Sequence, residues 1–108
     1  MDKYIIVTTF CDKKEIANKI IDVLLERKLV AGSQLSKVHS KYWWNNKLEE
    51  CDEYKLEFRT REELFTRIKN EIMKIHDYEI TEISYCNIED ANRVFFYFSN
   101  SQSFFFYD

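Results

Sequence analysis

The sequence predicts a small α+β domain in which helices cover one face of a four-stranded sheet. Its 108 residues fit a single domain, expected over residues 1–108. Segments with strand-like and helical spacing alternate in the order β-α-β-β-α-β, followed by an extra helix near the C-terminus. Hydrophobic residues make up 45% of the chain, and aromatic residues 17%, which is enough apolar material for a packed core.

The composition excludes several classes of protein. One glycine and no proline leave no glycine-rich loop for a nucleotide phosphate. A net charge of −3 argues against a general nucleic-acid binder. No apolar stretch is long enough for a membrane span or a signal peptide. Three widely spaced cysteines are a poor disulfide framework, so we expect a cytoplasmic protein.

The first strand and helix are predicted from residue type and spacing. Residues 4–9 are β-branched and aromatic, which is typical of a central strand. Asp12 and Glu15 fit a capping box that starts a helix, and apolar residues then recur at helical spacing to about Lys28. Gly32, the only glycine, is expected to adopt a backbone conformation that other residues resist.

A long hairpin follows. Residues 34–44 and 47–60 are rich in strand-forming residues, and Asn45 and Asn46 between them suit a two-residue turn with positive φ. Both strands exceed the usual five or six residues. We therefore expect the distal end of this ribbon to pack against another partner.

The second half of the chain repeats the helix-strand order. Thr60 and Glu63 fit a second capping box, before an amphipathic helix that ends near Ile75. A turn over residues 76–79 leads to a strand over residues 82–87, whose side chains facing the core are predicted to be Ile83, Tyr85 and Cys86. Residues 88–100 are expected to form the third helix. The aromatic tail over residues 103–108 matches no pattern.

This element order is that of the ferredoxin-like fold. Right-handed crossovers place both helices of the βαββαβ unit on the same face of the sheet. The opposite face then has no helix to cover it. Since the chain is rich in aromatic residues, we expect it to bury this surface by self-association.

Four segments resemble the CutA family, the divalent-cation tolerance proteins. They are the hairpin tip over residues 41–50, the passage over residues 26–32, the triplet over residues 58–60 and the segment over residues 76–83. They occur in family order over most of the chain. The resemblance implies a ferredoxin-like subunit, a homotrimer similar in architecture to the PII signalling proteins, and a role in tolerance of divalent metals such as copper.

The sequence departs from the family pattern at a few positions. Asp77 and Thr81 replace two prolines, and Gly32 replaces a cysteine. At the end of the first strand Thr8 stands where the family often has cysteine, while Cys11 lies beyond it. These differences argue against a thiolate copper site at the end of that strand.

His76 and Glu82 are the candidate metal ligands. An imidazole and a carboxylate suit Cu(II) or Zn(II), and Asp77 and Glu79 lie close enough in sequence to assist. The alternative is structural: His76 caps the end of a helix, and Glu82 pairs with a basic side chain. No cofactor is required, and weak binding of Cu(II) or another divalent cation is expected.

A second set of residues matches recurrent family positions and could line a cleft between subunits. There a small anion would meet two basic side chains between aromatic walls. The alternative is that the same residues are contacts that hold the trimer together. The set comprises Tyr42, Trp44, Lys47, Arg59, Tyr78 and Glu82.

The remaining polar residues do not predict a catalytic site. His39 lies in the predicted second strand and is interpreted as a surface or interface residue. The carboxylates at positions 49, 50, 52 and 53 are interpreted as a solvated acidic edge. No nucleophile is paired with a base in sequence, so catalysis is not expected. Three hypotheses remain: a metal-binding or regulatory trimer, a PII-like sensor of a small anion, and a purely structural trimeric scaffold.

Overall fold

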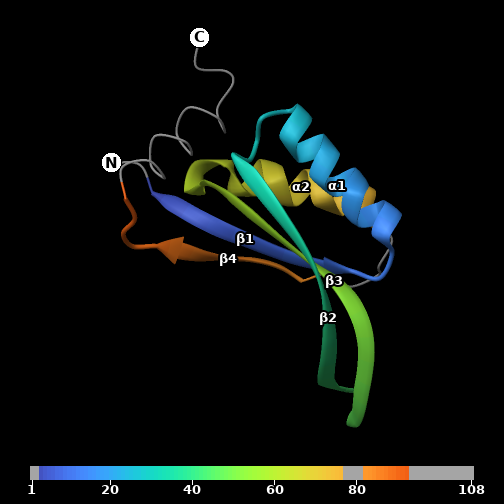
Figure 1. Ribbon diagram of the computed structural model, residues 1–108. Helices are drawn as coiled ribbons and strands as arrows, with labels where there is room; N and C mark the ends of the chain where they lie inside the picture. Colours follow the sequence, from blue (N-terminus) through green and yellow to red (C-terminus); the bar gives the residue numbers. More distant parts are fainter. Residues whose placement is uncertain (1–2, 77–81, 93–108) are drawn as a thin grey trace.

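The computed structural model describes residues 3–76 and 82–92, which form four strands and two α-helices (Figure 1). Their order is the predicted βαββαβ. The elements are β1 (Tyr4–Cys11), α1 (Lys14–Glu26), β2 (Gly32–Trp44), β3 (Lys47–Arg61), the short 3-10 helix η1 (Glu62–Leu64), α2 (Phe65–Ile75) and β4 (Ile83–Ile88).

The strands form one antiparallel sheet in the order β2-β3-β1-β4. Both α-helices lie on the same face of this sheet, as Figure 1 shows. This arrangement confirms the predicted α+β class and the ferredoxin-like order. No helix in the described part of the chain is long and apolar enough to cross a membrane.

The core lies between the sheet and the two helices. Alternate residues of β1 are fully buried on the helix side, and β3 contributes alternate residues in the same way, as its sequence pattern predicts. Phe58 is the largest fully buried side chain. The cluster includes Ile5, Val7, Ala17, Ile20, Leu24, Leu56, Phe58, Ile68 and Ile72.

The hairpin of β2 and β3 extends well past the rest of the sheet (Figure 1). The two strands pair continuously from Gly32 and Arg59 to Trp44 and Lys47, whereas the pairing of β3 with β1 stops at Tyr54. Asn45 and Asn46 have φ of 50° and 62°, which confirms the predicted turn. We call the two-stranded part beyond Tyr54, residues 38–53, the distal ribbon.

Neither predicted capping box forms. Helix α1 begins after Lys13, one residue later than the predicted capping box places it, and Lys13 makes no side-chain capping hydrogen bond. Thr60 lies inside β3, where its buried hydroxyl donates a 2.6 Å hydrogen bond to the carbonyl oxygen of Leu29. At Thr60 strand pairing therefore overrides the local capping signal.

Two further expectations about single residues are wrong. Gly32 lies in β2 without positive φ, and in the connection between α1 and β2 the residue with positive φ is Lys28, at 54°. Cys86 is exposed on the sheet face opposite the helices, since it pairs with Ile6. The predicted orientation holds for Tyr85, whose ring centroid lies 4.7 Å from that of Phe65.

The predicted third helix does not begin where expected. Ile88 is the last residue of β4, and residues 89–92 are not helical. The rest of that segment, residues 93–100, and the aromatic tail over residues 103–108 lie outside the described residues.

The substitution Phe58→Ala is expected to lower the free energy of unfolding by about 3–5 kcal/mol, because it leaves a cavity in the fully buried core. Urea denaturation at a fixed protein concentration measures this change. Met73→Ala is the control: this side chain is 62% exposed, and its loss should change the stability by less than about 0.5 kcal/mol. Equal effects of the two substitutions would contradict this assignment of the core.

Candidate functional site: a cleft and a polar cluster on the hairpin

A cleft of about 590 Å³ lies where the distal ribbon approaches the ends of β1 and β4. The hairpin contributes two aromatic walls, Tyr42 and Trp44, and β1 contributes Phe10. Because β3 twists away from β1 beyond Tyr54, the ribbon and the sheet form two sides of a hollow. The lining residues are Phe10, Ser40, Lys41, Tyr42, Trp44, Cys51, Glu53 and Glu82.

The charges that line the cleft favour a cation. Among the described residues that line it, Lys41 is the single basic one, against the carboxylates of Glu53 and Glu82. The Lys41 ammonium lies 3.9 Å from a third carboxylate, that of Glu50. The pKa of the Tyr42 hydroxyl is raised, mainly by its 3.9 Å contact with the Cys51 sulfur and further by nearby carboxylates. A negative field of this kind attracts positive ligands.

The two basic residues predicted to bind an anion are far apart within one chain. Lys47 is next to the turn at the tip of the hairpin, whereas Arg59 lies on the same strand where it pairs with β1. They are twelve positions apart on β3, which at about 3.3 Å per residue is roughly 40 Å along the strand. Arg59 donates a 3.0 Å hydrogen bond to the side chain of Gln34. One anion can contact both residues only if they come from different copies of the chain.

The candidate metal ligands His76 and Glu82 are both tied to the C-terminal end of β1. The Nε2 atom of His76 lies 2.5 Å from the carbonyl oxygen of Phe10 and donates to it. The hydroxyl of Thr9 donates to the carbonyl oxygen of Glu82 at 2.8 Å, and Ser84 donates to the Glu82 carboxylate at 3.1 Å. β1 thus brings the two candidates to the same end of the sheet.

His76 also caps the end of a helix, which is the structural alternative to metal binding given above. It is the C-cap residue of α2, and its backbone N–H donates to the carbonyl oxygen of Ile72. Among the described residues, no three side chains of histidine, cysteine, aspartate or glutamate converge to hold one metal ion. Asp77, Tyr78 and Glu79 lie outside the described residues, so their predicted roles stay predictions.

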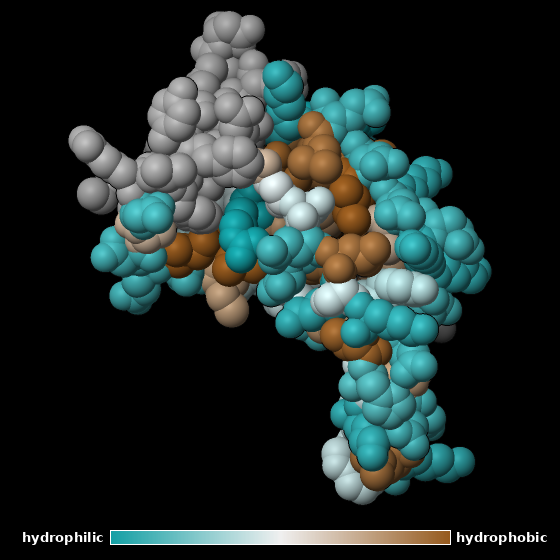
Figure 2. Space-filling view, in the orientation of Figure 1, coloured by the Kyte–Doolittle hydropathy of each residue, from teal (hydrophilic) through white to brown (hydrophobic). Residues whose placement is uncertain are grey.

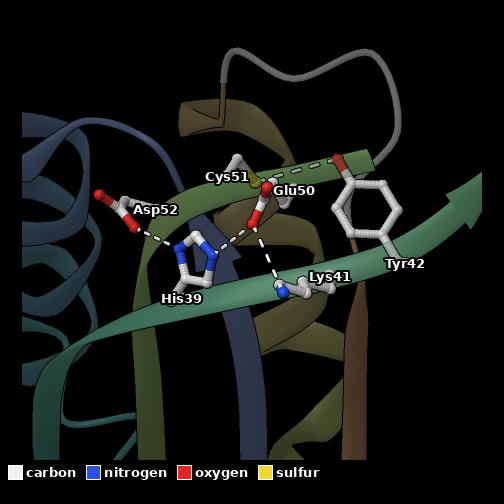
Figure 3. Close-up of polar contacts among 6 residues, drawn as sticks. All are labelled: His39, Lys41, Tyr42, Glu50, Cys51 and Asp52. Atoms are coloured by element: carbon white, nitrogen blue, oxygen red, sulfur yellow. Dashed lines mark hydrogen bonds and ion pairs between the residues drawn. The ribbon is translucent and has the colours of Figure 1, made fainter. Parts of the chain in front are cut away.

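A polar cluster centred on His39 lies on the distal ribbon (Figure 3). The Nδ1 atom of His39 is 2.7 Å from a carboxylate oxygen of Asp52, and its Nε2 atom is 2.7 Å from one of Glu50. The ring comes from β2 and both carboxylates come from β3. The sequence analysis missed this cluster, although the Asn45-Asn46 turn sets the register that places Asp52 opposite His39.

The hairpin tip is apolar and exposed. Figure 2 shows hydrophilic side chains along the projecting ribbon and less polar ones at its end. Trp43 is 73% exposed and lies directly opposite Leu48, which is 63% exposed. Large apolar side chains on the surface of a small domain are typical of an interaction site.

Comparison with known proteins matches the whole domain to one family. The profile of the family "CutA1 divalent ion tolerance protein" matches residues 5–102. The divalent-cation tolerance protein CutA of Pyrococcus horikoshii is 35% identical over 88 residues, which cover 82% of this chain and 85% of the relative. The protein of the same name from Thermococcus kodakarensis is 32% identical over 93 residues, 86% and 88% of the two chains.

Solved structures agree with this match. The crystal structure of CutA1 from Pyrococcus horikoshii superimposes with a TM-score of 0.85 at 29% identity, covering 92% of this chain and 97% of that one. The structure described as the periplasmic divalent cation tolerance protein CutA from Archaeoglobus fulgidus has a TM-score of 0.84 at 28% identity, over 95% and 99% of the chains. The chain therefore belongs to the CutA1 divalent ion tolerance family.

Proposed function

We propose that this protein supports divalent-metal tolerance as a homotrimer that binds divalent cations weakly and carries out no catalysis. The observation that carries the proposal is the hydrogen bond from Nε2 of His76 to the Phe10 carbonyl oxygen. A histidine that binds a metal commonly donates its other ring N–H to a carbonyl or carboxylate, which fixes the ring and its tautomer. His76 has such a contact to a backbone carbonyl, and we place the proposed metal ion on its imidazole ring.

Glu82 is the second proposed ligand. Its carboxylate belongs to the lining of the negatively charged cleft, and its backbone is fixed by the hydroxyl of Thr9. An imidazole and a carboxylate favour Cu(II) or Zn(II) over Mg(II) or Ca(II). Two protein ligands leave the remaining positions to water, so the affinity is expected to be low.

The proposed trimer is supported by the hairpin. In the described part of the chain, β2 forms one edge of the sheet, and the distal ribbon carries the exposed pair Trp43 and Leu48. Edge-to-edge pairing with another subunit would satisfy the free backbone groups of β2 and bury these side chains.

A binding role is supported by the contacts of the two histidines. His39 bridges two carboxylates, and His76 donates to a backbone carbonyl. Because both ring nitrogens of His39 contact carboxylates, this ring has no nitrogen left to accept a proton from the hydroxyl or thiol of a nucleophile. A cytoplasmic location is supported by the three cysteines, since none of them forms a disulfide.

Calorimetric titration with Cu(II) and with Zn(II) tests the metal proposal. The wild-type protein is expected to bind weakly, and Glu82→Gln and His76→Ala are each expected to reduce the affinity at least about tenfold, as losses at a metal ligand commonly do. Glu26→Gln, which removes an exposed carboxylate at the end of α1, is the control and should leave binding unchanged. Equal affinities in all four proteins would exclude this site.

Native mass spectrometry tests the assembly. A mass of three chains is expected for the wild-type protein at micromolar concentration. Leu48→Asp should raise the concentration at which the trimer dissociates by about tenfold or more, since it places a charge among apolar interface contacts. Met73→Asp, at a similarly exposed position on α2, is the matched control. A folded wild-type monomer, or equal effects of the two substitutions, would contradict the proposed interface.

A further inference from the structure

We infer that protonated His39 joins the two strands of the distal ribbon at the point where the ribbon leaves the sheet, and that loss of its proton weakens this junction. We call the contacts of His39 with Asp52 and Glu50 the clasp. The ring of His39 on β2 lies between two carboxylates of β3, those of Asp52 and Glu50 (Figure 3). The facing pair His39 and Asp52 comes two residues beyond Tyr54, the last β3 residue paired with β1.

The hydrogen bonds require a particular charge state. Carboxylates at neutral pH only accept hydrogen bonds, so both ring nitrogens of His39 must donate. Only the imidazolium has two N–H donors, because the neutral ring has one donor and one acceptor. With both N–O distances at 2.7 Å, the geometry fits the protonated ring. Loss of the proton therefore removes one of the two cross-strand bonds.

The charged groups around His39 come from two strands. β3 contributes Glu50 and Asp52, and β2 contributes Lys37 and Lys41 on the same face. In the described sheet β2 is an edge strand, so β3 is the single strand paired with it. The Lys41 ammonium lies 3.9 Å from the Glu50 carboxylate that His39 also contacts. Glu50 is therefore shared between His39 and Lys41, and Lys41 also lines the cleft.

The pKa shifts agree with the geometry. The pKa of His39 is raised, mainly by its hydrogen bond to Asp52 and then by that to Glu50. The pKa of Asp52 is lowered, mainly by its hydrogen bond to His39. Both hydrogen bonds of the clasp are present below the unfolded-state pKa of histidine, about 6.5, and one of them is lost as the pH rises through the raised folded-state pKa. The clasp also weakens in acid, as the pH falls through the lowered pKa of Asp52.

The clasp acts on the exposed end of the hairpin. His39 lies between the anchored part of the sheet and the tip that presents Trp43 and Leu48. Within one chain, a two-stranded ribbon is only marginally stable. The protonation of this one ring thus sets how many side-chain hydrogen bonds join β2 to β3 between the sheet and the tip.

A titration by nuclear magnetic resonance tests the inference, because the chain has just two histidines, His39 and His76. The ring signals of His39 in the full-length protein are expected to titrate with a pKa above 6.5. The variant Asp52→Asn should lower this pKa most, and Glu50→Gln should lower it less. The variant Glu49→Gln, on the opposite face of β3, is the matched control and should leave it nearly unchanged.

The backbone amides of residues 40–51 provide the second measurement. Their chemical shifts are expected to follow the His39 midpoint in the wild-type protein and to lose this transition in His39→Gln. Any one of three results would overturn the inference. They are a His39 pKa at or below 6.5, a His39 pKa that neither carboxylate variant lowers, and amide chemical shifts in the ribbon that do not change with the protonation of His39.

Discussion

The length mismatch within the sheet is the constraint on which the rest of this structure depends. β2 and β3 pair along thirteen residues of β2, whereas β1 supports only the eight residues of β3 from Tyr54 onward. The distal ribbon is therefore held by its own cross-strand contacts and turn. A ribbon of two strands is marginally stable alone in water, so its order has to come from side-chain contacts, from neighbouring chains, or from both.

Both candidate sites, the cleft and the His39 cluster, lie where the hairpin extends past β1. Where the ribbon curves away from β1, it leaves a cleft in which the carboxylates of Glu53 and Glu82 outnumber the ammonium of Lys41. Where it leaves the sheet, His39 joins its strands through Asp52 and Glu50. The core has no part in either feature. Alternating buried residues on β1 and β3 hold the domain together. The polar and aromatic side chains of the two candidate sites lie mainly on the exposed ribbon.

The sequence predicted the elements that depend on periodicity and failed where two local signals compete. Strand alternation and the Asn45-Asn46 turn gave the hairpin and its register, which already implies that Asp52 faces His39. The second capping box failed because β3 extends through Thr60, whose hydroxyl donates to the carbonyl oxygen of Leu29, far away in sequence. The contact of His76 with Phe10 could not be predicted, since it depends on how α2 packs at the end of β1.

Hydrogen exchange of the ribbon amides, measured by mass spectrometry over a dilution series, tests the central claim most directly. If neighbouring chains order the distal ribbon, the amides of residues 40–51 will be protected at high protein concentration and lose protection on dilution, while the buried strand β1 stays protected. Protection of the ribbon that does not change with concentration, in a chain with the mass of a single subunit, would contradict the account.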